Sequence, residues 1–349
     1  MARRVGILTG GGDCPGLNAV IRAVVRKADA LGWQSMGILE GWRGLLENKI
    51  EPLDLLRVSG ILYRGGTILR TSRTNPLKHP DGFGRLRENV RQNGLDALIA
   101  IGGDDTMSIA DRLFQEGVPV VGVPKTIDND LNGTDYCFGF DTAVNIATEA
   151  IDRLHTTAEA HNRIMVVEVM GRDSGWIAVA SGMAGGADVI LIPERPVDIA
   201  QVCAHLRKRH ERGKDFSIVV VAEGAKLPVA REGDAGAQVQ QSRFKDEFGH
   251  AQLGGIGSLL AQEIEERTGF ETRVVILGHI QRGGSPSAFD RILATRFGVV
   301  AMTLVDQADF GKMTALKGNR IVAVPLSEAA RSPRPVDPEL YETAEVFFG

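Results

Sequence analysis

The 349 residues are enough for two lobes that each bury their own core, and 43% hydrophobic against 24% charged residues is an ordinary globular balance. The formal net charge of −4 leaves no basic surplus for nucleic acid or an anionic membrane, and no apolar run reaches the length of a membrane span, so we expect neither partner. Three widely spaced cysteines favour reduced thiols over a disulfide or zinc framework, which predicts a cytoplasmic protein.

Short apolar runs recur along the chain, and most are continuous instead of alternating. They cover residues 5–8, 97–101, 118–123, 164–169, 189–192, 218–222, 274–277 and 321–324. Strands buried on both faces have this pattern, and it is typical of a parallel sheet. Segments with a helical period lie between several of them, at 107–114, 142–155, 199–210, 256–267 and 287–305. The predicted fold class is therefore α/β.

The first apolar run leads into a glycine-rich turn at residues 10–16 and then an amphipathic helix over residues 17–31. Glycines let backbone N–H groups approach a ligand, and a helix N-terminus adds partial positive charge, so the turn predicts an anion site. It lacks the Lys-Ser/Thr of a P-loop and the spacing of a dinucleotide fingerprint. Taken alone, a tight strand-to-helix turn explains the same residues equally well.

A second glycine turn, residues 102–106, places two carboxylates where a phosphate would be expected to bind. Adjacent acids at such a turn need a cation, and Mg²⁺ held by Asp104 and by phosphate oxygens is the natural candidate. The alternative is that Asp105 is the N-cap of a helix beginning near Thr106.

A third strand end carries Lys125, Asp128 and Asp130 within six residues. In an open α/β sheet the ligand crevice lies beyond the carboxyl ends of the strands. We therefore expect the three loops to converge on one site, and convergence favours chemistry over three coincidental turns.

Together these motifs resemble the phosphofructokinase family from about residue 3 to about residue 305. They are Gly-Gly-Asp at 11–13, Gly-Gly-Asp-Asp-Thr at 102–106, Pro-Lys-Thr-Ile-Asp-Asn-Asp at 124–130, Met-Gly-Arg at 170–172, Glu223, and Gly-His-Ile-Gln-Arg-Gly-Gly at 278–284. The resemblance implies two doubly wound three-layer α/β/α lobes. These are a donor lobe of residues 1–139 plus about 282–331, a fructose 6-phosphate lobe of residues 140–281, and a C-terminal extension of residues 332–349.

The resemblance also implies roles in phosphoryl transfer. Asp128 would take the proton from the sugar 1-hydroxyl, and Asp130 would orient or assist it. Thr126 would contact the transferring group, Arg172 would stabilise its charge, and Asp104 would bind Mg²⁺. These roles agree with the chemistry, because phosphoryl transfer needs positioning, charge neutralisation and an acceptor for the nucleophile's proton.

For fructose 6-phosphate, the resemblance implies a site in which Thr126, Asp128 and Arg172 are joined by Arg163, Met170, Gly171, Glu223, Arg273, His279 and Arg282. The 6-phosphate needs fixed cations, and a guanidinium can bind two of its oxygens at once. In the family, Arg163 and Arg273 come from a neighbouring subunit, which implies a homo-oligomer, dimer or tetramer, with shared active sites. Without the motifs, each arginine would be read as a solvated surface residue and His279 as a core histidine.

For the donor, the resemblance implies contacts from Gly12, Arg73, Gly103, Asp105 and Lys125. Most bacterial ATP-using members carry glycine at the positions of Asp105 and Lys125. The pair resembles the pyrophosphate-using branch, in which the aspartate fills the place of the ATP α-phosphate and the lysine holds pyrophosphate. The alternative is a lineage variant that still uses ATP.

Two further features bear on regulation and architecture. Arg22 and Arg26 match effector-site arginines of allosteric relatives, but Leu55 and His155 stand where those relatives have arginine, so we expect no tight nucleotide or phosphoenolpyruvate effector. Residues 226–254, rich in glycine, glutamine and charge, are predicted to be an exposed loop or insertion.

Two functions of other classes are less consistent with these residues. NAD kinases also use a Gly-Gly-Asp turn, but they would not explain residues 170–172 or 279–282. A silent sugar-phosphate sensor would need neither a base nor a metal, yet the chain keeps Asp104, Asp128 and Arg172 together with Thr126 and Asp130.

Overall fold

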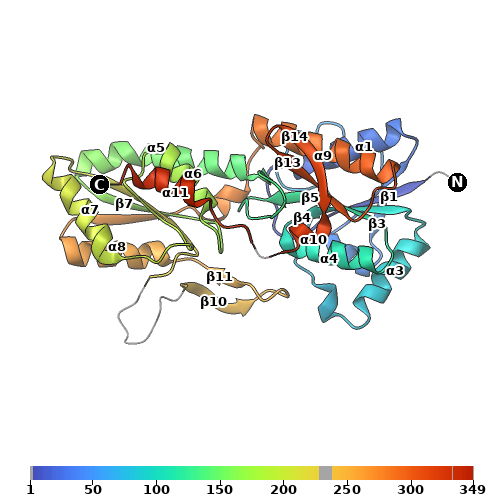
Figure 1. The fold of residues 1–349 in the computed structure, drawn as a ribbon, viewed down its shortest axis with the longest axis horizontal. Coiled ribbons are helices and arrows are strands. Elements are labelled where there is room, and N and C mark those ends of the chain that lie inside the picture. The colour runs from blue at the N-terminus through green and yellow to red at the C-terminus, as the bar shows by residue number, and fades with distance from the viewer. Residues whose placement is uncertain (1–2, 228–237, 332, 349) are drawn as a thin grey trace.

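Figure 1 shows two α/β lobes joined end to end; the structure, a computed structural model, describes residues 3–227, 238–331 and 333–348. The first lobe has one sheet of order β14-β13-β5-β4-β1-β2-β3, with β6 beside β5. Its strands are β1 (Arg4–Thr9), β2 (Gln34–Ile38), β3 (Ile50–Leu53), β4 (Ala97–Gly102), β5 (Val120–Thr126), β6 (Phe138–Gly139), β13 (Lys312–Lys317) and β14 (Arg320–Pro325). Its helices are α1 (Leu17–Ala30), α2 (Gly41–Leu46), the 3₁₀ helix η1 (Pro76–Lys78), α3 (Gly82–Gln92), α4 (Asp104–Gln115), α9 (Ala288–Asp306) and α10 (Leu326–Ala329).

The central strand β4 explains why the apolar runs are continuous. All six of its residues are buried. Ile99 and Ile101 belong to the core that α1 and α9 cover, whereas Leu98 and Ala100 belong to the core that α4 covers. Because successive side chains of a strand point to opposite faces, a sheet covered on both faces needs apolar residues at every position.

Helix α9 returns the chain to the first lobe by packing against α1. A Cβ atom added at Gly298 would lie 2.8 Å from both the Ala23 Cβ and the Val20 carbonyl oxygen. The two helices therefore approach too closely for any larger residue there. This contact brings β13 and β14, which follow α9, to the edge of the first sheet.

The second lobe has a four-stranded parallel sheet of order β12-β7-β9-β8. Its strands are β7 (Ile164–Val169), β8 (Val189–Leu191), β9 (Ser217–Ala222) and β12 (Thr272–Ile276). Its helices are α5 (Phe140–His161), α6 (Trp176–Ala184), α7 (Ile199–Glu211), α8 (Ile256–Thr268), the 3₁₀ helix η2 (Gly278–Arg282) and α11 (Pro338–Glu345). On this strand pairing we propose a division into residues 1–139 plus about 282–331 and residues 140–281, with 332–349 as an extension.

The α/β fold class is confirmed, and each of the eight predicted apolar runs contributes to a strand. The sheets are not wholly parallel, because β3 runs antiparallel to β2 and β14 antiparallel to β13. None of the helices in the described parts of the chain is long and apolar enough to cross a membrane.

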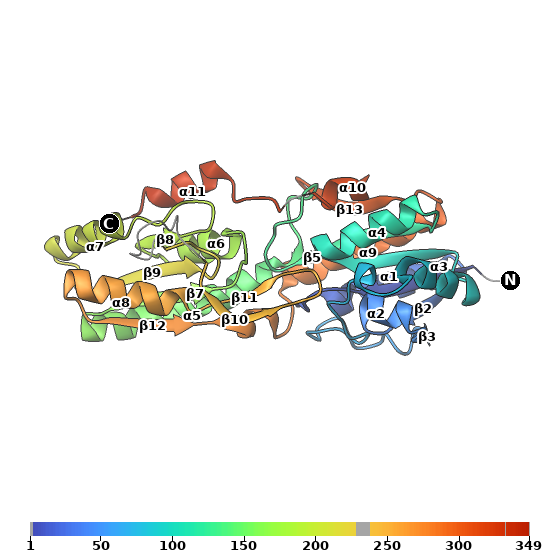
Figure 2. The same cartoon turned by 90° about the horizontal axis from the view of Figure 1, so that it is seen from below.

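Residues 226–254 are predicted to be an exposed loop or an insertion, and the loop alternative is wrong over the C-terminal half. β10 (Gln240–Lys245) and β11 (Ala251–Leu253) pair there as an antiparallel hairpin. Figure 2 shows this hairpin beside the junction of the two lobes. Residues 228–237 of the predicted loop lie outside the described residues.

Candidate active site

The three glycine and acidic loops converge, as predicted, at the carboxyl ends of the neighbouring strands β1, β4 and β5. They meet loops of the second lobe around one small cavity. Its lining residues are Gly11, Gly12, Arg73, Gly103, Asp104, Asp105, Thr106, Lys125, Thr126, Asp128, Arg172 and Arg282. Every residue predicted to bind the donor is among them.

The first turn is bounded by two cations. Lys125 Nζ donates a hydrogen bond to the Gly12 carbonyl, and Arg282 Nη1 donates to the Asp13 carbonyl at 3.3 Å. A Cβ atom at Gly12 would lie 2.7 Å from Arg282 Nη1, so the glycine is what lets the guanidinium reach the turn. Lys125 is buried, which lowers the pKa of its ammonium group. A buried ammonium group and a half-buried guanidinium beside a glycine turn fit an anionic ligand.

The second turn opens helix α4, whose N-cap is Gly103, with Asp104 and Asp105 in the first turn. The N-cap alternative for Asp105 is therefore wrong. Carboxylates in a first turn are stabilised by the helix dipole. Burial, and then the neighbouring Asp105, raise the pKa of Asp104. A cation beside this pair would stabilise the charged form of both carboxylates.

Asp104 fits Mg²⁺ only together with a ligand. Among the described residues, no three His, Cys, Asp or Glu side chains form a group that could hold a metal ion alone. Mg²⁺ usually binds one or two carboxylates and completes its shell with water and phosphate oxygens. The half-buried Asp104 carboxylate in the lining of this small cavity matches that mode.

The loop after β5 holds the predicted base. Asp128 is buried, its backbone N–H donates to Thr126 Oγ1 at 3.0 Å, and its Oδ1 has no hydrogen-bond partner within the described structure. Burial, and then the Asp128 charge, raise the pKa of Asp130. Two acids share this loop, and a carboxylate oxygen with no partner is available to accept a proton.

A cavity of about 350 Å³ adjoins the first one, and both are lined by Arg73, Arg172 and Arg282. Its other lining residues are Met170, Glu223, Ala251, Leu253 and His279. Gly171, with φ 149°, lies between two of these and could not carry a Cβ, which would meet the Ser174 carbonyl at 2.4 Å. The three shared arginines place positive charge where a group would pass between the cavities.

Glu223 is the carboxylate in the lining of this second cavity. It accepts a hydrogen bond from the Arg172 backbone N–H at 3.3 Å. Burial, and then the Asp128 charge, raise its pKa to about 7. A carboxyl group in this state can hydrogen-bond a sugar hydroxyl as donor or as acceptor.

Two predicted phosphate ligands are not in the cavity. Arg163 and Arg273 lie beside β7 and β12, where both pair with Glu271, Arg163 at 2.8 Å. Arg273 lies on β12, an edge strand of the described four-stranded sheet, and Arg163 directly precedes the inner strand β7. The sharing of sites between subunits stays a prediction.

The positions of the family's effector arginines have other roles here. His155 Nε2 lies 2.7 Å from the Gly185 carbonyl, and its ring packs edge-on against Phe216. Arg22 and Arg26 lie on α1, where Arg26 is exposed. His155 is thus part of the packing of the second lobe.

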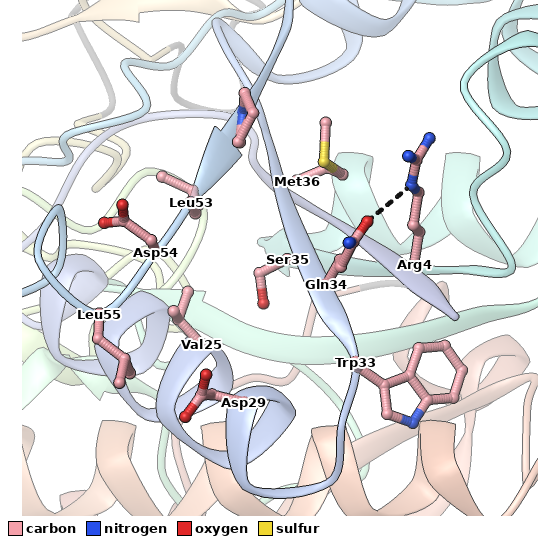
Figure 3. Close-up of a pocket in the computed structure, with 11 residues that line it drawn as sticks. Arg4, Val25, Asp29, Trp33, Gln34, Ser35, Met36, Leu53, Asp54 and Leu55 are labelled. Atoms are coloured by element: carbon pink, nitrogen blue, oxygen red, sulfur yellow. Dashed lines mark hydrogen bonds between the residues drawn. The ribbon is translucent and has the colours of Figure 1, made fainter. Parts of the chain in front are cut away.

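A cavity of about 400 Å³ lies at the outer edge of the first lobe, with Leu55 in its lining. Figure 3 shows the residues that line it. Its carboxylates are Asp29 and Asp54, and its one cationic lining residue, Arg4, donates to Gln34 at 3.0 Å. This lining offers no cation cluster for a phosphate-bearing effector.

Two contacts were not predicted from the sequence. The hairpin places His250 Nε2 3.0 Å from Asp105 Oδ2, and the C-terminal segment places Arg334 beside the loop after β5 that carries Asp128 and Asp130. Arg334 Nη2 donates to the carbonyls of Asn129 at 2.9 Å and Asp135 at 3.0 Å, and its backbone N–H donates to the Asp130 carbonyl. Asn129 has φ 53°, so these bonds hold a left-handed residue between the two acids.

Replacing Arg334 by alanine should therefore destabilise the protein and slow catalysis. Loss of charge-assisted bonds to two carbonyls is expected to cost ~2 kcal/mol, with kcat reduced ~10-fold. Thermal unfolding and steady-state kinetics measure both. Arg195→Ala is the control, since Arg195 stacks on Tyr341 of the same C-terminal segment without contacting the loop. Equal effects from both variants would remove Arg334 from the positioning of the loop.

Residues 4–305 match the phosphofructokinase family. The chain is 60% identical over 348 residues to the pyrophosphate–fructose 6-phosphate 1-phosphotransferase of Streptomyces coelicolor, with 99% of this chain and 100% of the relative covered. It is 59% identical over 347 residues to the protein of that name from Amycolatopsis methanolica, with the same coverage. It is also 53% identical over 343 residues to ATP-dependent 6-phosphofructokinase 3 of S. coelicolor, covering 98% of this chain and 99% of the relative.

Solved structures agree with this match. Pichia pastoris phosphofructokinase in the T-state superposes with a TM-score of 0.82 at 32% identity, over 99% of this chain and 36% of that much longer chain. A pyrophosphate-dependent phosphofructokinase from Marinobacter aquaeolei gives a TM-score of 0.80 at 22% identity, over 97% of this chain and 86% of that one. The second comparison shows a shared fold.

Proposed function

Because this chain belongs to the phosphofructokinase family and is a phosphotransferase, we propose that it transfers a phosphoryl group from pyrophosphate to the 1-hydroxyl of fructose 6-phosphate. The products are fructose 1,6-bisphosphate and phosphate, and the reaction runs in both directions in the cytoplasm. The observation that carries the choice of donor is the presence of Asp105 and Lys125 together in the lining of the donor cavity.

The size of the donor cavity also favours a compact donor. Its volume is about 50 Å³, against about 350 Å³ for the adjoining cavity that we assign to the sugar phosphate. Sites for drug-sized ligands usually enclose ~300–1,000 Å³. The small enclosed volume therefore fits a compact donor such as pyrophosphate.

The residues of the chain divide the chemistry as follows. Asp128 accepts the proton of the sugar 1-hydroxyl. The hydroxyl oxygen attacks one phosphorus of pyrophosphate, and the bond from that phosphorus to the leaving phosphate breaks. Arg172, present in both cavities, neutralises charge on the transferring group, and Arg282 binds the 6-phosphate of the sugar with His279. Lys125 holds the donor on the first turn. A divalent metal, Mg²⁺ at Asp104 in our proposal, would offset negative charge on the donor oxygens.

The second candidate donor is ATP, which relatives at 50–53% identity use according to their names. One assay separates the two: formation of fructose 1,6-bisphosphate by purified protein with Mg²⁺ and either pyrophosphate or ATP. We expect a strong preference for pyrophosphate. Turnover with ATP alone would reject the proposal, and no turnover with either donor would favour a silent sensor.

We further propose a homo-oligomer in which Arg163 and Arg273 complete the phosphate site of a neighbouring subunit. Mixing Asp128→Asn protein with Arg163→Ala protein should then restore activity. Half of randomly mixed dimers are hybrids with one complete site of two, so recovery should reach about a quarter of the wild-type rate. The readout is activity after verified subunit exchange.

The matched control mixes Asp128→Asn with Arg282→Ala. Arg282 lines the same cavity as Asp128 of its own chain, so no hybrid site would be complete. Recovery in this control, or none in the first mixture, would argue against shared sites.

A further inference from the structure

The β10–β11 hairpin belongs to the second lobe by sequence, yet its tip contacts the first lobe at the donor cavity. Asp246 Oδ2 lies 3.2 Å from Arg73 Nη1, and Glu247 Oε2 accepts a hydrogen bond from the Asn75 backbone N–H at 2.7 Å. His250 Nε2 lies 3.0 Å from Asp105 Oδ2. The hairpin thus connects the two lobes at the cavity's edge, as its place in Figure 2 suggests.

Hydrogen bonds within the tip fix the backbone at His250. Asp246 Oδ1 accepts hydrogen bonds from the backbone N–H groups of Phe248 at 3.1 Å and His250 at 3.0 Å. Phe248 packs against the core of the first lobe that contains Leu98. Because the backbone of His250 is fixed by Asp246, its imidazole has a preset direction toward Asp105.

Asp105 raises an electrostatic problem for a pyrophosphate site. A carboxylate in the lining of a cavity for a highly charged anion repels that anion as well as ATP. Of the cavity's cations, Lys125 and Arg282 donate to the carbonyls of the first turn. Among the described residues, His250 is the side chain that hydrogen-bonds Asp105. That bond raises the pKa of the imidazole and favours its charged form.

We propose that His250 is a positioning and donor-specificity residue: it fixes Asp105 at the end of the donor cavity and offsets its charge on the side away from pyrophosphate. This inference rests on the proposed function. With His250 in place, Asp105 limits the length of the donor without repelling a short one. Without His250, Asp105 repels pyrophosphate too.

The test is a double-mutant cycle on Asp105 and His250. Four proteins are compared: wild type, His250→Ala, Asp105→Asn, and the double variant. Asn keeps the shape of Asp105 and removes the charge that His250 offsets. The readouts are the KM for pyrophosphate, the KM for fructose 6-phosphate, and the Kd for magnesium pyrophosphate measured by calorimetry without the sugar.

In the Asp105 background, His250→Ala should weaken pyrophosphate binding ~10-fold, the usual worth of a charged hydrogen bond, and change the sugar KM less than ~2-fold. In the Asp105→Asn background the same change should alter pyrophosphate binding less than ~2-fold. His205→Ala, on the distant helix α7, is the control for loss of a histidine and should leave every constant unchanged.

Equal losses in both backgrounds, or a sugar KM that rises as much as the pyrophosphate KM, would overturn the inference. Such results would mean that His250 only stabilises the hairpin, whose Ala251 and Leu253 line the sugar cavity. In those cases wild-type turnover with pyrophosphate would leave the proposed function intact. A wild type that binds ATP and not pyrophosphate would reject the proposed function, and this inference with it.

Discussion

Asp128→Asn should lower kcat by at least ~10²-fold, the usual worth of a positioned base, while fructose 6-phosphate still binds. Asp128 is buried, with one carboxylate oxygen that no described group bonds. Asparagine keeps its shape and cannot accept the proton. Steady-state turnover with saturating pyrophosphate and calorimetric binding of fructose 6-phosphate separate the chemical step from affinity.

Asp111→Asn provides the matched control. Asp111 lies on α4 of the same lobe, bonds only to Gln115 among the contacts described, and does not line either cavity. Its turnover should equal that of the wild type. If Asp128→Asn retains near-normal kcat, Asp128 is not the base, and Asp130 becomes the residue to test.

A strand could be predicted from the sequence when both of its faces are buried. β4 could be found from the sequence because both of its faces are covered, so all of its residues are apolar. β2, with the sequence Gln-Ser-Met-Gly-Ile, has exposed and polar positions and gave no such signal. β10 is polar along most of its length and forms a strand through pairing with β11, a tertiary effect that local composition does not encode.

Site residues could be predicted when they stand close together in the sequence, in one motif. Asp104 and Asp105, like Asp128 and Asp130, stand in short motifs whose glycines and charges are recognisable together. The bond from His250 to Asp105 spans 145 positions. The bond from Arg334 to Asn129 spans 205. Neither residue stands in a motif, so its role could come only from the folded chain.

The choice of donor should reverse, at least in part, when both discriminating residues are replaced: Asp105→Gly with Lys125→Gly is expected to lose pyrophosphate activity and to admit ATP. By the family resemblance, Asp105 lies where the α-phosphate of ATP would bind. Two like charges at about 4 Å repel by ~4 kcal/mol at an effective dielectric constant of about 20. That repulsion corresponds to at most roughly a thousandfold in affinity, because His250 offsets part of the Asp105 charge.

Lys125 contributes the attractive half of the discrimination. It is buried, and it donates to the Gly12 carbonyl at the first turn. Pyrophosphate concentrates its charge on a short molecule, so it gains more from this cation than ATP does. Specificity of this kind combines attraction for one ligand with repulsion of its competitor. Lys125→Gly alone should accordingly weaken pyrophosphate use without creating ATP use, because Asp105 remains.

The measurement is kcat/KM for each donor with the wild type, the Lys125→Gly variant and the double variant, with thermal unfolding to verify that each is folded. Glycine in the first turn of α4 is expected to cost ~0.5–1 kcal/mol of stability, too little to explain a complete loss of activity.

The wild type should also run in reverse, forming pyrophosphate from fructose 1,6-bisphosphate and phosphate. Pyrophosphate and the sugar phosphate differ less in phosphoryl-transfer potential than ATP and the sugar phosphate do. Wild-type protein that turns over ATP as fast as pyrophosphate would contradict the assignment of Asp105 and Lys125, because a carboxylate at that position would then impose no measurable penalty on the α-phosphate.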